Sequence, residues 1–139
     1  MFDYEGTINK LLVDDKGVTM LAVFGLPPLA HENDATRAVL ASLGIGTLLN
    51  QLSLTPTIGL ASGDTFCGVI GHRGGRKEYT VIGDTVNLAA RLVMYAQSES
   101  LLVITDSRTR YLCKDSVEFE EFTPTINVKG KKQVRDKKI

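Results

Sequence analysis

The sequence has few cysteines, few aromatic residues and no excess of charge of one sign. Its two cysteines, Cys67 and Cys113, cannot form a disulfide framework or fill a zinc site by themselves. Sixteen Lys and Arg balance sixteen Asp and Glu, so no general electrostatic attraction to nucleic acid or anionic lipid is expected. No apolar run approaches the roughly 18 residues of a transmembrane helix, and the polar N-terminus lacks a signal-peptide core. These absences favour a cytoplasmic chain, or the cytoplasmic part of a larger one, that binds neither nucleic acid nor membrane.

The length of 139 residues suits one domain. With 43% hydrophobic and 23% charged residues, the composition is that of an ordinary globular protein with enough apolar surface for a core. No linker or internal repeat divides the chain. We therefore expect a single domain over residues 1–132, with a basic tail at 133–139 that is frayed.

Runs of β-branched and apolar residues alternate irregularly with helical patterns along the chain. Several of these runs flank short loops that contain Gly, which is typical of β-hairpins. The pattern predicts an α+β fold with a mainly antiparallel sheet and helices packed on it. Asn33 or Asp34 is expected to cap the first helix and Asp84 the second. The expected strands span 8–13, 18–24, 57–61, 65–70, 78–82, 101–104, 117–122 and 126–128, and the expected helices 35–49, 85–95 and 106–112.

The glycine-rich stretch GVIGHRGGRKEYTVIGD invites comparison with phosphate-binding loops. It has no Gly-Lys-Ser/Thr at the required distance, and its glycines do not join a strand to a helix in the manner of dinucleotide-binding proteins. The glycines are therefore expected to turn a hairpin. His31 and His72 lack the spacing of a metal pair or of a nucleophile's partner, and both are expected to face solvent.

Asn87 and Arg91 are four residues apart on a predicted helix and so share one face of it. An arginine fork is suited to phosphate, and an asparagine beside it can both donate and accept hydrogen bonds. Spacing alone favours a polar stripe on an amphipathic helix over a binding site. Lys129 and Lys131 follow a predicted strand, where they would either meet a polyphosphate or belong to a solvated basic tail.

Three segments together resemble one family. The run EYTVIGDTVNLAARL, preceded by IGLASGDTFCGVIG and followed by INVKGK, resembles the catalytic domains of the class III adenylate and guanylate cyclases. The resemblance extends over about residues 7–131. NKLLVDDKGVTMLAVFGLPP is most similar to the second catalytic half of the soluble, bicarbonate-responsive adenylyl cyclases and their bacterial relatives. It implies a ferredoxin-like sheet and a head-to-tail dimer with the nucleotide in the groove between the two halves.

The resemblance also implies a role for individual residues. Asn87 would orient the ribose and Arg91 would stabilise charge at the reacting phosphate. Lys10 and Thr80 would contact the base, and Lys129 the polyphosphate. Guanine-specific relatives tend to carry Glu and Cys at the two base positions, so Lys10 with Thr80 favours ATP as the substrate.

The metal-binding half of the family's site has no counterpart in this sequence. Val18 occupies the position of one metal-binding aspartate and cannot ligate Mg²⁺. The neighbouring Asp14 and Asp15 are expected to be solvated turn residues. The strand that carries the other aspartate would precede Met1.

We therefore expect this chain to supply no metal ligand, while two Mg²⁺ or Mn²⁺ ions are held by a partner half and the nucleotide. The isolated chain would then be inactive or nearly so. The alternative is a catalytically degenerate module that regulates or dimerises.

Overall fold

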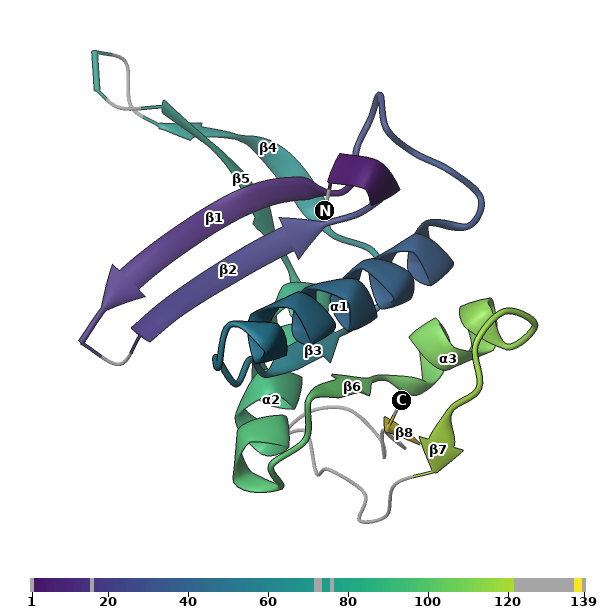
Figure 1. Cartoon of the computed structure of the whole chain (residues 1–139). Coiled ribbons are helices and arrows are strands. Elements are labelled where there is room, and N and C mark those ends of the chain that lie inside the picture. Colours follow the sequence, from purple (N-terminus) through teal and green to yellow (C-terminus); the bar gives the residue numbers. More distant parts are fainter. Residues whose placement is uncertain (1, 16, 72–73, 76, 122–136, 139) are drawn as a thin grey trace.

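The computed structural model describes residues 2–15, 17–71, 74–75, 77–121 and 137–138. Figure 1 shows two β-hairpins beside a helical body. The elements in chain order are η1 (Phe2–Tyr4), β1 (Thr7–Asp14), β2 (Gly17–Val23), α1 (Asp34–Gln51), β3 (Ile58–Leu60), β4 (Phe66–Gly71), β5 (Lys77–Ile82), α2 (Asp84–Ser98), β6 (Val103–Thr105), α3 (Ser107–Cys113), β7 (Glu120–Glu121) and β8 (Lys137–Lys138).

The described strands form three sheets. β1 pairs with β2, β4 pairs with β5, and the third sheet has the order β3-β6-β8-β7. β3 and β6 run parallel, whereas the other described pairings are antiparallel. A parallel pair needs a long crossover, and here the second hairpin and α2 supply it. The α+β fold with mainly antiparallel pairing is confirmed, with this one parallel pair that local sequence patterns do not reveal.

β3 and β6 lie between the two longer helices. Gly59 of β3 is opposite Ile104 of β6, and both face α2, where Ile104 packs with Leu92 and Ala96. Successive side chains of a strand point to opposite faces, and α1 also contacts both strands. α1 therefore covers the other face, so the core is a thin sheet with one helix on each side.

The two hairpins lie side by side, and β1 contacts β5 (Figure 1). Both hairpins expose many large apolar side chains, whereas the surface of a monomeric protein rarely carries large apolar patches. The exposed apolar side chains of the first hairpin are Ile8, Leu11, Leu12, Val13, Val18 and Met20, and those of the second are Phe66, Val69, Ile70, Tyr79 and Ile82. Among the described residues, both hairpins therefore expose many apolar side chains.

The start of α2 differs from the sequence prediction. The helix begins at Asp84, and its N-cap is Gly83, whose φ of 148° is readily adopted only by glycine. Asp84 is thus the first helical residue, where its negative charge interacts favourably with the positive end of the helix dipole. The Thr85 hydroxyl donates to the Asp64 carbonyl at 3.1 Å, which ties the helix start to the loop after β3.

α3 is capped by Asp106, within the range predicted for that helix. One carboxylate oxygen, Oδ1, accepts from the Thr109 amide at 2.9 Å and from the Ser62 amide at 3.4 Å. The Ser62 and Thr109 hydroxyls are also hydrogen bonded, at 2.7 Å. The cap therefore joins the end of β3 to the start of α3.

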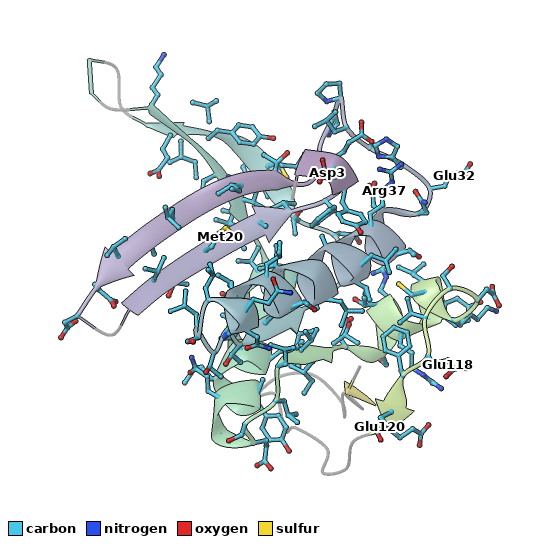
Figure 2. The ribbon with its side chains drawn as sticks, in the orientation of Figure 1. Asp3, Met20, Glu32, Arg37, Glu118 and Glu120 are labelled. Carbon is cyan, nitrogen blue, oxygen red and sulfur yellow. The ribbon has the colours of Figure 1, made fainter. Side chains whose placement is uncertain are left out.

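His31 is less exposed than the sequence suggests. Its Nε2 lies 2.9 Å from a Glu5 carboxylate oxygen, and its Nδ1 lies 3.3 Å from an Asp34 carboxylate oxygen. Arg37 contacts the same Glu5 oxygen at 2.9 Å, and Figure 2 shows Arg37 near η1. Its Nε also donates to the Asn33 side chain, so Asn33 stands at the N-cap of α1 without bonding a helix amide. His72 lies outside the described residues.

The C-terminal region is described in part. Of the strand expected over 117–122, Glu120–Glu121 pair as β7. The strand expected over 126–128 lies outside the described residues. Lys137 and Lys138 form β8 between β6 and β7, and the other residues of the expected tail lie outside the described residues. No described helix has both the length and the apolar character needed to cross a bilayer.

Candidate functional site

Asn87 and Arg91 lie one turn apart on the exposed side of α2. Leu92 and Ala96 on the opposite side are fully buried in the core, and this amphipathic pattern fixes which side chains reach solvent. Neither the Asn87 amide nor the Arg91 guanidinium has a hydrogen-bond or ion-pair partner among the described residues. Their donors are therefore available to an external ligand, and an arginine fork is suited to phosphate oxygens.

Lys10 and Thr80 lie on the two hairpins. Lys10 is half-buried on β1, and Thr80 on β5 is 5% exposed. The pairing of β1 with β2 is irregular here, because Ile8 is opposite Ala22 whereas Lys10 is opposite Leu21. Asn9 is the extra residue of this β-bulge, and a bulge redirects the side chains around it.

Asn9 connects the hairpins beside Lys10 and Thr80. Its Nδ2 donates to the carbonyl oxygen of Tyr79 at 3.3 Å. Asn9 immediately precedes Lys10, and Tyr79 immediately precedes Thr80, so the hydrogen bond brings their backbones together. The sequence reasoning missed Asn9, although an asparagine inside a β-prone run was a usable signal, since this residue is uncommon in strands.

β5 leads from Thr80 to the start of α2 through Gly83, and α2 packs against β5. Four of the five expected ligand-binding residues are therefore carried by three adjacent elements: β1, β5 and α2. Lys129 lies outside the described residues. The arrangement places two polar side chains on the hairpins, Lys10 and Thr80, and an amide and a guanidinium one turn apart on the helix.

The described residues do not fit a divalent metal by themselves. They contain no group of three or more His, Cys, Asp or Glu side chains that could hold one ion. Val18 is exposed on β2, and its side chain has no atom that can bind a metal. Asp14 and Asp15 are exposed at the end of the first hairpin. Mg²⁺ requires several oxygen ligands, so no reaction step is assigned to a metal held by these residues.

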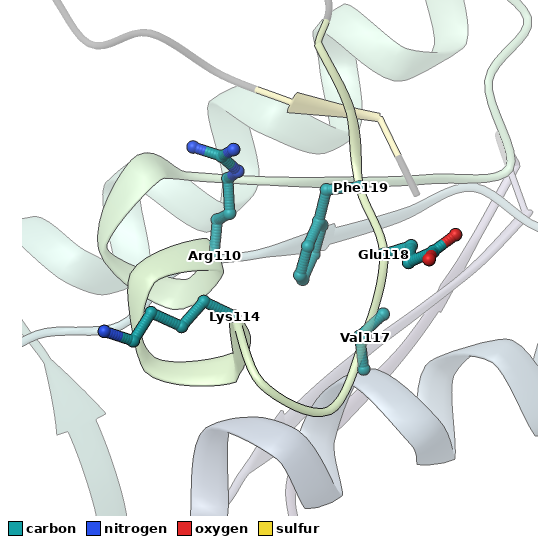
Figure 3. Close-up of a pocket in the computed structure, with 5 residues that line it drawn as sticks. All are labelled: Arg110, Lys114, Val117, Glu118 and Phe119. Atoms are coloured by element: carbon teal, nitrogen blue, oxygen red, sulfur yellow. The ribbon is translucent and has the colours of Figure 1, made fainter.

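A separate hollow lies around α3. It measures about 340 Å³ and is lined by Arg110, Lys114, Val117, Glu118 and Phe119. Figure 3 shows these side chains around the turn after α3. None of them belongs to the expected site, and the Lys114 ammonium is already engaged 4.9 Å from the centre of the Tyr111 ring.

Cys113 at the end of α3 is buried between that helix and α1. Burial raises the pKa of its thiol, and a hydrogen bond with Thr36 offsets part of this increase. A thiol held in its protonated form is a poor nucleophile. Cys113 is therefore a packing residue.

Residues 13–137 match the pattern of the Adenylate and Guanylate cyclase catalytic domain. Human Adenylate cyclase type 10 is 45% identical over 94 residues, which cover 66% of this chain and 6% of that protein. The structure of the adenylyl cyclase CyaB from P. aeruginosa is 27% identical and superposes with a TM-score of 0.74, covering 99% of this chain and 72% of that one. The guanylyl cyclase Cya2 is 25% identical, with a TM-score of 0.65 over 99% of this chain and 70% of that one.

The expected fold and the expected motifs thus agree with an independent match over most of the chain. The chain spans only a small fraction of Adenylate cyclase type 10. The sequence match and the similarity of the whole described fold lead to the same assignment: this chain belongs to the family of adenylate and guanylate cyclase catalytic domains.

Proposed function

We propose that this chain is half of an adenylate cyclase site, which converts ATP to 3′,5′-cyclic AMP and diphosphate together with a second cyclase domain. In this reaction the ribose 3′-oxygen bonds to the α-phosphorus as the bond to diphosphate breaks. The hydroxyl proton leaves to a base or to water. The chain supplies groups that bind the base, orient the ribose and stabilise charge on the phosphoryl oxygens. The partner half and the nucleotide hold the Mg²⁺ or Mn²⁺ ions.

The availability of Asn87 and Arg91 carries this proposal. Both side chains are exposed one turn apart on α2, and neither is engaged by another described residue. Charge that develops on the phosphoryl oxygens would be met by the donors of Arg91, and such preorganised donors are often the largest catalytic contribution. Asn87 would hydrogen-bond the ribose and hold its 3′-hydroxyl in line with the phosphorus.

Adenine as the base is supported by Lys10 and Thr80. A lysine donates but cannot accept, whereas a threonine hydroxyl does either, and this pair matches adenine's ring-nitrogen acceptor and exocyclic amine. The 45% identity to a protein named Adenylate cyclase type 10 points in the same direction. Because solved guanylyl cyclases also share the fold, the choice between ATP and GTP depends on these two residues.

A second cyclase half, arranged head to tail, is supported by the apolar hairpin surface. Its exposed Leu, Val, Ile and Phe side chains are more numerous than a monomeric surface normally carries. The metal-bearing half, in the same longer chain or another subunit, would cover this surface and enclose the nucleotide. Lys129 would then contact the polyphosphate.

The proposal is tested by mixing this chain with a metal-bearing cyclase half and measuring cyclic AMP formed from ATP with Mn²⁺. Activity is expected in the mixture, with little or none from the chain alone. Arg91→Ala is expected to reduce kcat by about 10²- to 10³-fold, the usual effect of removing one transition-state donor. Arg108→Ala is the matched control, since Arg108 is an exposed arginine on α3 outside the site.

A regulatory or dimerising module is the competing function. It is favoured by one observation, the absence of a metal-binding cluster among the described residues. Such a module would tolerate Asn87→Ala and Arg91→Ala in the assembled complex. Cyclic AMP formation that is unchanged by both substitutions would therefore reject the catalytic proposal.

A further inference from the structure

We propose that Asn9 is a positioning residue for purine selection, holding Lys10 and Thr80 at the separation that fits adenine. This inference rests on the proposed function, because it concerns the base-binding part of the same site. Asn9 itself is not expected to touch the nucleotide. Its role would be exerted through the hydrogen bond from its Nδ2 to the Tyr79 carbonyl.

The atoms joined by this hydrogen bond are close in sequence to both base-binding residues. The Tyr79 carbonyl and the Thr80 amide belong to one planar peptide unit, so holding the carbonyl also orients the backbone of Thr80. On the other side, one peptide unit separates Asn9 from Lys10. Lys10 and Thr80 are thus connected through Asn9 and its hydrogen bond by a short series of atoms with few freely rotating bonds.

The bond also matters because the hairpins belong to different sheets. β1 pairs with β2 and β5 with β4, and no described ladder connects β1 to β5. Their relative position therefore depends on side-chain contacts rather than on a continuous backbone network. The bulge at Asn9 turns its amide out of the β1–β2 register and toward β5.

The side-chain oxygen of Asn9 lowers the stability of this arrangement. Its Oδ1 is buried and has no hydrogen-bond partner among the described residues. A buried acceptor without a partner destabilises a fold, and an apolar side chain of similar size would avoid this loss. Stability alone thus gives no reason for an asparagine here, whereas holding the Tyr79 carbonyl does.

A shift between the hairpins would alter base contacts more than it would displace α2. Asn87 and Arg91 are carried by a helix anchored in the core through Leu92 and Ala96, and Asn9 does not belong to that cluster. Loss of the Asn9 hydrogen bond should therefore affect KM and the preference between purines more than kcat.

The test compares the ratio of kcat/KM for ATP to that for GTP in the chain mixed with a metal-bearing cyclase half. Asn9→Leu removes the donor together with the buried acceptor, so its thermal unfolding should change little. We expect its ATP preference to fall about 5- to 10-fold, the size of one hydrogen bond's contribution. Asn9→Gln keeps an amide donor and should retain more of the preference. Asn50→Leu is the matched control, since Asn50 is exposed on α1.

A folded Asn9→Leu variant with an unchanged ATP-to-GTP ratio would overturn the inference while leaving the proposed function standing. If that variant does not fold, Asn9→Ser serves in its place, because its hydroxyl is too short to reach the Tyr79 carbonyl. The same fall is expected there, and an unchanged ratio is equally decisive. A wild-type mixture that forms no cyclic nucleotide, or whose product formation is insensitive to Arg91→Ala, would instead reject the proposed function and this inference together.

Discussion

Gly59 of β3 lies directly against the backbone of Ala89 in α2. A Cβ atom placed on Gly59 would stand 2.6 Å from the Ala89 carbonyl oxygen and 2.7 Å from the Val93 amide nitrogen. Both are backbone atoms, which cannot move aside as a flexible side chain would. The absence of a side chain at Gly59 thus sets how closely the helix that carries Asn87 and Arg91 approaches the sheet.

Gly59→Ala should therefore destabilise the fold and displace α2. Overpacking of this kind costs about 1–3 kcal/mol, which thermal unfolding would measure as a lower melting temperature. Gly44→Ala is the matched control, because a Cβ there meets no atom within 4 Å and alanine is the better helix former. A Gly59→Ala variant as stable as Gly44→Ala would contradict the close packing.

Substitution of Lys10 and Thr80, the two residues proposed to bind the base, should change nucleotide preference. Lys10→Glu together with Thr80→Cys is expected to raise the kcat/KM for GTP relative to ATP about tenfold or more, since each mismatched polar contact costs ~1–3 kcal/mol. Cysteine is close to threonine in size, so the buried position of Thr80 should accept it. Initial rates with each nucleotide, in the presence of a metal-bearing half, provide the measurement.

The double variant needs its own control. Lys77→Glu makes the same charge change at an exposed position of β5 and should leave the preference unchanged. Equal preferences in the double variant and the wild type would mean that Lys10 and Thr80 do not contact the base.

Asp106→Ala should loosen the junction of β3 and α3. The substitution leaves the Thr109 and Ser62 amides without the carboxylate oxygen that accepts from both. Removal of an N-cap lowers the free energy of unfolding by about 0.5–2 kcal/mol. Because the Ser62 amide also loses its acceptor, we expect a value toward the upper end of this range. Chemical denaturation would measure the difference from Asp115→Ala, an exposed carboxylate later in the same region. Equal midpoints for the two variants would rule out this role of the cap.

The two cysteines should differ in reactivity toward a disulfide reagent. Cys113 is buried with a raised pKa, whereas Cys67 is partly accessible on β4. We expect Cys67 to be labelled first in the native protein and Cys113 to be labelled only as the chain unfolds. A Cys67→Ser variant isolates the second event, and rapid labelling of that variant under native conditions would contradict the burial of Cys113.

The same thiol makes stability depend on pH in the alkaline range. The folded pKa lies above the unfolded one, so the folded state keeps its proton to higher pH. The contribution to the free energy of unfolding is present below the unfolded pKa and declines as pH rises toward the folded pKa. Removing the thiol with Cys113→Ala should flatten this part of the stability profile.

Local patterns in the sequence predicted most elements, because hairpins and amphipathic helices are encoded within a few residues. The first hairpin follows from two apolar runs around a Gly-containing loop, and the helix that carries Asn87 follows from its apolar period. The N-cap of α2 was wrong by one residue, because the glycine conformation at Gly83 replaced a side-chain cap. The parallel pairing of β3 with β6 depends on a long crossover and had no local signal.

The candidate site was predictable only as separate pieces. Asn87 and Arg91 share a face because of helical spacing, so their proximity could be deduced from the sequence. Lys10 and Thr80 are 70 positions apart, and the contact between their hairpins depends on a bulge and on one side-chain hydrogen bond. The engagement of His31 by Glu5 likewise joins distant segments, which explains why the sequence suggested a solvent-facing residue.

The separation of β1, β5 and α2 into different structural units has an evolutionary consequence under the proposed function. Residues that choose the purine are carried by the hairpins, whereas residues that act at the phosphate are carried by a helix fixed in the core. A few substitutions in the hairpins could therefore change which cyclic nucleotide the protein forms, while the residues that act at the phosphate stay the same. Such modularity would allow one ancestral scaffold to diverge into adenine- and guanine-specific descendants.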